Sequence, residues 1–118
     1  RGDEVNVLVA FDQDSINRLI SETAEQALVV YDSDRVKEIP EVGHAVRLVD
    51  VPLQKMARDL GNPIVRNMIA LGIVLKQLNL NLDAAKQVIV DRFGSKGEKV
   101  VELNHKAIET GYQIKMKP

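Results

Sequence analysis

Hydrophobic residues recur at helical spacing over Gly61–Leu80, the most apolar part of the chain. Its apolar positions lie three or four residues apart in one stripe, which a second row widens: Ile64, Met68, Leu71, Leu75 and Leu78, then Val65, Ile69 and Ile73. Asn62 can accept a hydrogen bond from an exposed amide at the helix start, and Pro63 suits the first helical position. Because a helix that is apolar on most sides is buried, the sequence predicts a central helix here.

Gly72 interrupts this predicted helix where alanine would be favoured by about 1 kcal/mol. A glycine at such a position indicates that another backbone approaches closely. The apolar run is also far shorter than the roughly 20 residues that a membrane-spanning helix needs. We therefore expect a helix that is buried in a protein core.

Two nearly continuous apolar segments, Val5–Phe11 and Ala27–Tyr31, predict strands that are buried on both faces of a parallel sheet. Asp12 can cap a short helix between them, so the order is strand, helix, strand. This order is typical of an α/β unit with a right-handed crossover. A third strand is predicted over Ala45–Val51, although charged residues interrupt its pattern.

The remaining segments predict further helices. A short helix begins after Pro52 and ends at Gly61, and another runs from Asn81 to Gly94. Ser95 and Glu98 have the spacing of a capping box and predict a last helix, which Gly111 would end. We predict the α/β class: part of a Rossmann-like parallel-sheet domain that ends in a helical C-terminal half. Three strands are few for such a sheet, so residues 1–118 are expected to be a single domain that lacks its N-terminal portion.

Composition excludes several classes of protein. Lys plus Arg number 16 and Asp plus Glu 17, so the chain has no basic surplus for nucleic acid or an anionic membrane. The absence of cysteine excludes disulfides, thiolate metal sites and cysteine-bound iron–sulfur clusters in these 118 residues. These features favour a cytoplasmic protein, although the chain begins with Arg rather than Met.

Polar turns follow two of the predicted strands. Asp12 follows the first, and Asp32, Ser33 and Asp34 follow the second, where ligands bind in open α/β sheets. Simple helix capping and turn formation explain the same residues. No glycine-rich phosphate loop precedes a helix. His44 and His105 have no partner at metal-ligand spacing and are interpreted as surface or loop residues.

The start of the predicted central helix is the preferred candidate site. Amides at a helix start favour an anion, and Arg66 lies one turn further on. Arg66 and Asn67 are polar residues in an otherwise apolar helix, so Asn62, Arg66 and Asn67 are expected to face a ligand, a partner or solvent. The alternative is that Asn62 only caps the helix and Arg66 pairs with an acid such as Asp59. The segment Gly94-Ser95-Lys96-Gly97 is a second helix start beside a cation.

Four segments together resemble a known family: residues 3–14 and 27–33, which include the two predicted strands, residues 61–72 (Gly-Asn-Pro-Ile-Val-Arg-Asn-Met-Ile-Ala-Leu-Gly), and residues 91–112. In this order, from Gly2 to Tyr112, they are similar to the C-terminal part of the gamma subunit, or gamma domain, of 2-oxoacid:ferredoxin oxidoreductases. The glycine-rich strand–loop–helix and the Arg-Gly-Gly-type segment that open the family's gamma domain have no counterpart here. The resemblance therefore implies that roughly the first 70 residues of a typical gamma domain have no counterpart in these 118 residues.

The resemblance implies an enzyme that oxidatively decarboxylates a 2-oxoacid, such as pyruvate, to an acyl-CoA and passes electrons to ferredoxin. It implies partners of alpha, beta and delta type, which carry the thiamine diphosphate and the iron–sulfur clusters. The piece in hand would bind no cofactor alone and would be inactive alone. It would shape the complex and border the cleft for CoA and substrate through Asn62, Arg66 and Asn67.

Two other readings are open. The chain could be a non-catalytic structural or interaction domain of the same fold. It could also be the helical substrate domain of a nicotinamide-dependent dehydrogenase, which would require a glycine-rich fingerprint that this sequence lacks.

Overall fold

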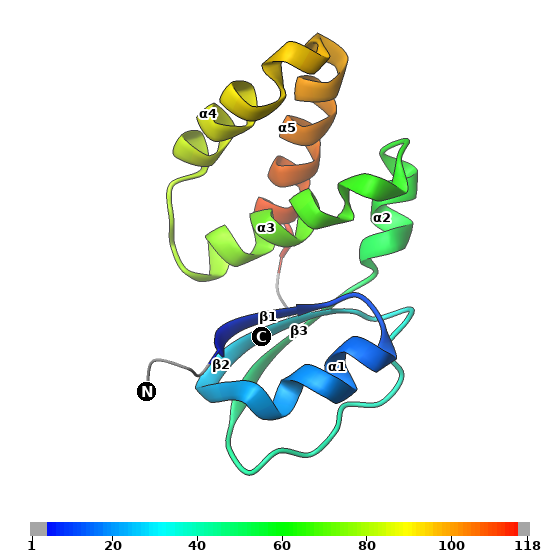
Figure 1. The fold of residues 1–118 in the computed structure, drawn as a ribbon, viewed down its shortest axis with the longest axis vertical. Helices are drawn as coiled ribbons and strands as arrows, with labels where there is room; N and C mark the ends of the chain where they lie inside the picture. The colour runs from blue at the N-terminus through cyan, green and yellow to red at the C-terminus, as the bar shows by residue number, and fades with distance from the viewer. Residues whose placement is uncertain (1–4, 116–118) are drawn as a thin grey trace. The chain divides into compact units, whose positions relative to one another are not determined.

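The computed structural model describes residues 5–115 and divides into two compact units. The first extends to Leu53 and contains the strands, and the second begins at Gln54 and is helical. Each unit is described by itself, with the labels of Figure 1.

The first unit contains a three-stranded parallel sheet in the order β1-β2-β3 (Figure 1). Its elements are β1 (Val5–Ala10), α1 (Gln13–Leu19), the 3₁₀ turn η1 (Ile20–Glu22), β2 (Thr23–Asp32) and β3 (Val46–Val51). The register pairs Leu8 with Val29, and Leu28 with Arg47. The predicted α/β class and the parallel pairing of the first two strands are therefore confirmed.

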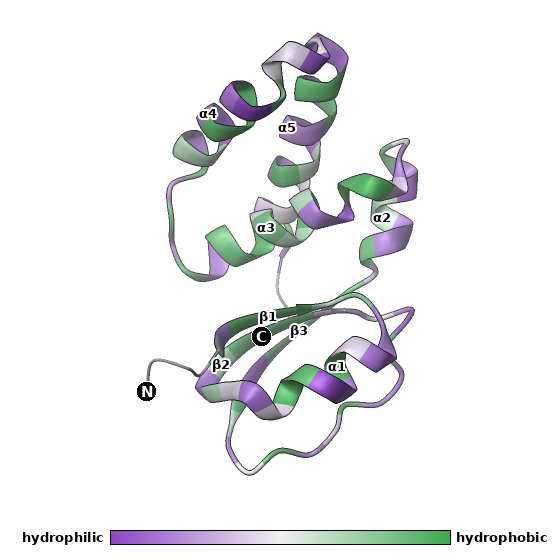
Figure 2. Cartoon of the chain, viewed as in Figure 1, coloured by the Kyte–Doolittle hydropathy of each residue, from purple (hydrophilic) through white to green (hydrophobic). Residues whose placement is uncertain are grey.

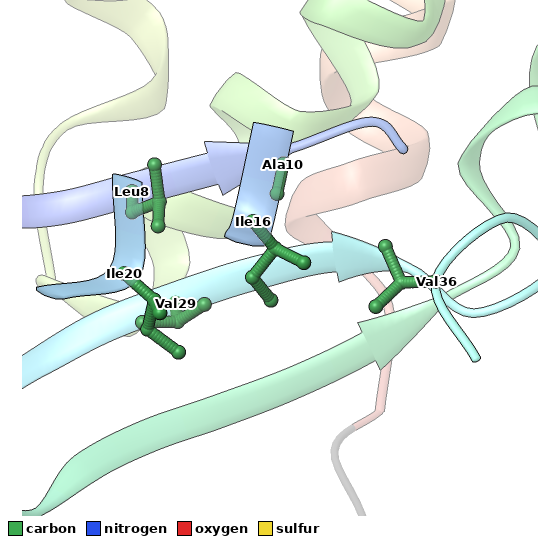
Figure 3. Packing of buried hydrophobic residues seen from close by; sticks show 6 residues of the cluster. All are labelled: Leu8, Ala10, Ile16, Ile20, Val29 and Val36. Carbon is green, nitrogen blue, oxygen red and sulfur yellow. The ribbon is translucent and has the colours of Figure 1, made fainter. Parts of the chain in front are cut away.

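Helix α1 packs on one face of the sheet. Figure 3 shows Ile16 and Ile20 against strand side chains of that face; the complete buried cluster is Leu8, Ala10, Ile16, Ile20, Val29 and Val36. Leu28, Val29 and Val30 are consecutive residues of β2, and each is 0% exposed. Because consecutive strand residues point to opposite faces, the middle strand is buried on both sides, as its apolar run predicts.

Strand β2 begins four residues before the apolar segment that predicts it. The register of β1 against β2 shifts between the pairs Val5–Thr23 and Val7–Leu28, so this part of the ladder is irregular. Gln26 has a φ of 64°, which a non-glycine residue seldom adopts. Its amide donates to the Ala45 carbonyl at 2.8 Å, so the irregular segment is tied to the residue before β3. No hydrophobic pattern marks such a segment, which explains the difference.

The second unit consists of α2 (Leu53–Asp59, which begins at the boundary), the 3₁₀ turn η2 (Pro63–Val65), α3 (Arg66–Gln77), α4 (Leu82–Phe93), the 3₁₀ turn η3 (Gly94–Lys96) and α5 (Glu98–Tyr112). Together with α1, these are the five helices that the sequence predicts. Figure 2 shows that α4 and α5 carry both hydrophobic and hydrophilic residues. Ile89 and Ile108 lie in their common core with Leu75 of α3.

Helices α3 and α5 touch through glycines. A Cβ on Gly72 would collide with the Ile108 carbonyl oxygen and would lie 2.8 Å from the Tyr112 nitrogen. A Cβ on Gly111 would collide with the Ile69 carbonyl oxygen. The predicted close approach at Gly72 is therefore confirmed. The prediction that Gly111 ends the last helix is wrong, because α5 continues to Tyr112 and Gly111 is a buried contact point.

The central helix buries only part of its predicted apolar surface. In the first row Leu75 is buried, but Ile64, Leu71 and Leu78 are 72%, 39% and 38% exposed. The second row, Val65, Ile69 and Ile73, is buried throughout. The reason is the glycine contact, which turns the side of α3 that carries Gly72 toward α5. The predicted capping box is also wrong: Gly97, with a φ of 107°, precedes α5, and no side chain caps the helix.

Candidate functional site

The start of the central helix is a capped 3₁₀ turn. Asn62 Oδ1 accepts a hydrogen bond from the Ile64 amide at 3.0 Å, which confirms the predicted cap. The Val65 amide donates to the Asn62 carbonyl at 3.2 Å, and the Arg66 amide donates to the Pro63 carbonyl. Pro63 has no N–H, and the next three amides, those of Ile64, Val65 and Arg66, donate hydrogen bonds within the chain. An anion here would be held mainly by side chains.

Arg66 and Asn67 differ in their surroundings. Arg66 is half-buried and Asn67 is exposed. Asp59, the acid considered as a partner for Arg66, forms an ion pair with Lys55, with 3.3 Å between Asp59 Oδ2 and Lys55 Nζ. Asn67 lies at the edge of a pocket, so the helix start presents a carboxamide to a cavity.

This pocket brings the two candidate helix starts together. It has a volume of about 260 Å³ and is lined by Ile64, Asn67, Met68, Phe93, Lys96, Val100 and Asn104. The sequence identifies Asn67 and Lys96 as parts of separate helix starts, but the packing of α3 and η3 around α5 places them at one cavity. Asn104 belongs to the same cavity and is not among the candidates that the sequence predicts. Its position in the hydrophobic pattern of α5 gives no sign that it lines a cavity.

The polar turns after the strands form local hydrogen bonds. Asp12 Oδ1 accepts from the Ser15 amide at 2.8 Å and caps α1. This hydrogen bond lowers the pKa of Asp12 below its ordinary value, and the charges of Arg35 and Arg18 lower it slightly further. Asp32 is fully buried, and its Oδ1 accepts from the Asp34 amide at 3.0 Å. These bonds favour the capping and turn interpretation.

The Gln13 side chain forms hydrogen bonds with the backbone of the loop between β2 and β3. Its Oε1 accepts from the Lys37 amide at 2.8 Å and from the Glu38 amide at 3.0 Å. Its Nε2 donates to the Glu38 carbonyl at 2.6 Å. The sequence contains no sign of this contact, because the partners lie 24 and 25 residues away.

Both histidines form hydrogen bonds within the chain. His105 Nε2 lies 3.1 Å from the Lys86 carbonyl oxygen, and His44 Nε2 lies 2.9 Å from Thr23 Oγ1. Over residues 5–115, no group of three or more His, Cys, Asp or Glu side chains could hold a metal ion. The same residues include no helix that is both long and apolar enough to cross a bilayer.

We expect His44→Ala to lower the free energy of unfolding by about 1 kcal/mol, the typical value of one hydrogen bond. Thr23 is buried and already donates its hydroxyl proton to the Ile20 carbonyl at 2.6 Å. His44 must therefore donate to Thr23, through its Nε2–H. Urea denaturation measures the effect, and His44→Gln, which can supply an N–H, should recover part of it. Equal losses in the two variants would show that the hydrogen bond contributes nothing.

Comparison with known proteins identifies the family. A family model described as pyruvate ferredoxin/flavodoxin oxidoreductase matches residues 1–114. The ketoisovalerate oxidoreductase subunit VorA of Methanothermobacter thermautotrophicus is 30% identical over 111 residues, which are 92% of this chain and 22% of that protein.

Two solved structures share the fold. The gamma subunit of a keto/oxoacid ferredoxin oxidoreductase from Geobacter sulfurreducens has a TM-score of 0.82 and 26% identity, over 92% of this chain and 62% of that one. The 2-oxoglutarate:ferredoxin oxidoreductase from Magnetococcus marinus, solved with 2-oxoglutarate, coenzyme A and succinyl-CoA bound, has a TM-score of 0.77 and 26% identity. That match covers 91% of this chain and 19% of the larger one.

The match extends over almost the whole chain, but the chain spans only part of each relative. It corresponds to 22% of VorA and to 62% of the Geobacter gamma subunit. The family model nevertheless includes all the helices and strands described above. The chain therefore belongs to the pyruvate ferredoxin/flavodoxin oxidoreductase family.

Proposed function

We propose that this chain is a gamma-type component of a cytoplasmic 2-oxoacid:ferredoxin oxidoreductase, and that residues 1–118 belong to a single gamma-type domain. The observation that carries the proposal is the structural likeness to the Geobacter gamma subunit over 92% of the chain. In the proposed reaction the bond between the acyl carbon and the carboxylate breaks and CO₂ leaves. The acyl carbon bonds to the CoA sulfur, the electrons pass to ferredoxin, and the thiol proton goes to solvent.

The proposed division of labour gives the redox chemistry to alpha, beta and delta partners. The chain has no cysteine for an iron–sulfur cluster. We expect the purified chain to contain neither iron nor thiamine diphosphate and to reduce no ferredoxin. Metal analysis, fluorescence detection of extracted thiamine diphosphate and an activity assay measure this. Stoichiometric cofactor in the isolated chain would contradict the proposed division.

For the candidate site, we propose that Asn62, Arg66 and Asn67 border the cleft for CoA. A guanidinium binds phosphate oxygens through paired N–H groups, so Arg66 suits the phosphates of CoA. Lys96 lies at the same cavity as Asn67 and adds positive charge there. The Magnetococcus relative was solved with coenzyme A bound, which supports CoA as the ligand of the assembled enzyme.

One observation favours the alternative, a non-catalytic structural or interaction domain of the same fold. The amides of Ile64, Val65 and Arg66 are all used within the 3₁₀ turn. A helix start that satisfies its own amides needs no ligand. The alternative gives the three polar residues a role in contacts with another subunit.

We expect Arg66→Ala to raise the KM for CoA about tenfold in the assembled complex, since one charged hydrogen bond is worth roughly that factor. The assay is CoA-dependent reduction of a one-electron acceptor by the complex of this chain with its partner subunits. The kcat at saturating CoA should change little, because the lost contact is made equally in ground and transition states. Arg58→Ala, which removes an exposed arginine of α2, is the matched control.

The outcomes separate the two functions. A raised KM with normal assembly supports the CoA site. Weaker assembly with an unchanged KM supports the interaction domain, and unchanged assembly and kinetics would contradict both roles for Arg66. Circular dichroism of Arg66→Ala, compared with that of the wild-type chain, shows whether the variant is folded.

A further inference from the structure

The pocket beside α3 and α5 has mainly apolar walls. Met68, Phe93 and Val100 come from three different helices and line the cavity together with Ile64. Ile64 is 72% exposed. A ligand with an apolar body would cover Ile64 and fill about 260 Å³, a volume that suits a small molecule.

A buried carboxamide also lines this cavity. Asn104 is 9% exposed, and its Nδ2 donates to the Val100 carbonyl at 2.9 Å. Within residues 5–115, this is the one hydrogen bond of the Asn104 side chain, and no fully buried side-chain N or O atom of these residues lacks a hydrogen-bond partner. The Asn104 oxygen is therefore accessible to solvent rather than enclosed in the core. The carboxamide has a free N–H and a free oxygen with which to hydrogen-bond a molecule in the pocket.

The charged residue at the pocket determines which sign of charge a bound molecule would carry. Lys96 is the charged residue among those lining the cavity, and its Nζ lies 5.8 Å from the centre of the Phe93 ring. Asn67 of α3 adds a second carboxamide to the lining. An ammonium and two carboxamides provide N–H donors, and the aliphatic and aromatic walls provide none. Such a set fits a small anion with an apolar body.

We propose that this pocket binds a small aliphatic carboxylate. The carboxylate accepts hydrogen bonds from Lys96, Asn67 and Asn104, and the hydrocarbon part lies against Met68, Phe93 and Val100. The site is formed by the helical unit alone. It shares Asn67 and Lys96 with the proposed border of the CoA cleft, but its test needs neither CoA nor a partner subunit, so the two proposals can fail separately.

The test uses the whole 118-residue chain labelled with ¹⁵N and titrated with four probes: isovalerate, isovaleramide, acetate and inorganic phosphate. Isovaleramide keeps the apolar body without the charge, whereas acetate and phosphate keep a charge with little or no apolar body. We expect isovalerate to bind saturably and to shift the side-chain amide signals of Asn67 and Asn104. Isovaleramide should bind at least about fivefold more weakly, the effect expected from one partly exposed ion pair. Acetate and phosphate should also bind more weakly, because they bury little or no apolar surface.

Two variants test the assignment to these residues. Lys96→Gln should weaken isovalerate about fivefold and leave isovaleramide unchanged, while Lys99→Gln, an exposed lysine outside the pocket lining, should change neither. Asn104→Asp should weaken isovalerate further by placing a second negative charge in the pocket. Equal binding of acid and amide, equal effects of the two lysine variants, or shifts confined to residues outside the pocket would each overturn the proposal.

Discussion

Replacing Gly72 with alanine is expected to lower the free energy of unfolding by about 3 kcal/mol, the upper end of the usual range for overpacking. The new methyl group would collide with the Ile108 carbonyl oxygen and lie 3.0 Å from its carbon. Both atoms are backbone, so the strain cannot be relieved by a change of rotamer. Gly111→Ala should have a similar effect, because its methyl group would meet the Ile69 carbonyl.

The expected loss at Gly72 opposes the intrinsic preference of a helix, in which alanine is favoured over glycine by about 1 kcal/mol. Gly94→Ala is the matched control. Gly94 has a φ of −55°, and a Cβ there would have no neighbour within 4 Å. Urea denaturation of the variants should show a large loss for Gly72→Ala and little change for Gly94→Ala. A Gly72→Ala variant as stable as the wild type would mean that α3 and α5 are not in direct backbone contact.

Gln13→Ala is expected to lower the free energy of unfolding by about 2 kcal/mol, since it removes three hydrogen bonds to the loop, each worth roughly 0.5–1.5 kcal/mol. The loop joins β2 to β3 without a helix, and Gln13 holds its backbone at Lys37 and Glu38. The loss should also make the loop more sensitive to proteases, because local opening precedes cleavage. Urea denaturation and limited proteolysis measure the two effects.

The control for Gln13 is the same substitution at Gln87. The Gln87 side chain makes one exposed hydrogen bond, to Asp91 Oδ1 at 3.1 Å, within its own helix. Gln87→Ala should change stability by less than about 0.5 kcal/mol. Gln13→Glu is a further test, because a carboxylate would face the Glu38 carbonyl where Nε2 now donates. If Gln13→Ala and Gln87→Ala were equally mild, the loop would not depend on Gln13.

Elements that are specified by neighbouring residues could be predicted from the sequence. The continuous apolar run of β2 indicated a strand buried on both faces, and Asp12, Asn62 and Asn81 indicated the starts of three helices, where each side chain accepts a backbone N–H. These signals are local, because a cap and its amide lie within three residues of each other.

Features that depend on distant residues could not be predicted in the same way. The buried face of α3 depends on how α5 packs against Gly72, so the apolar pattern does not show that Ile64 and Leu71 stay exposed. The pocket that joins Asn67 to Lys96 likewise results from the packing of α3 and η3 around α5. Asn62, Arg66 and Asn67 stay predicted site residues, which the CoA kinetics will test.

The glycine contact between α3 and α5 also restricts how the helical unit can move. At Gly72 and Gly111, the carbonyl of each helix occupies the space where the other would carry a Cβ. If one helix slid along the other, a residue with a Cβ would take the place of the glycine opposite the carbonyl oxygen and would collide with it. The same face of a helix recurs only after a full turn, or about 5.4 Å. Small sliding motions are therefore blocked, and α3 and α5 should move together as one rigid body in any rearrangement of a larger assembly.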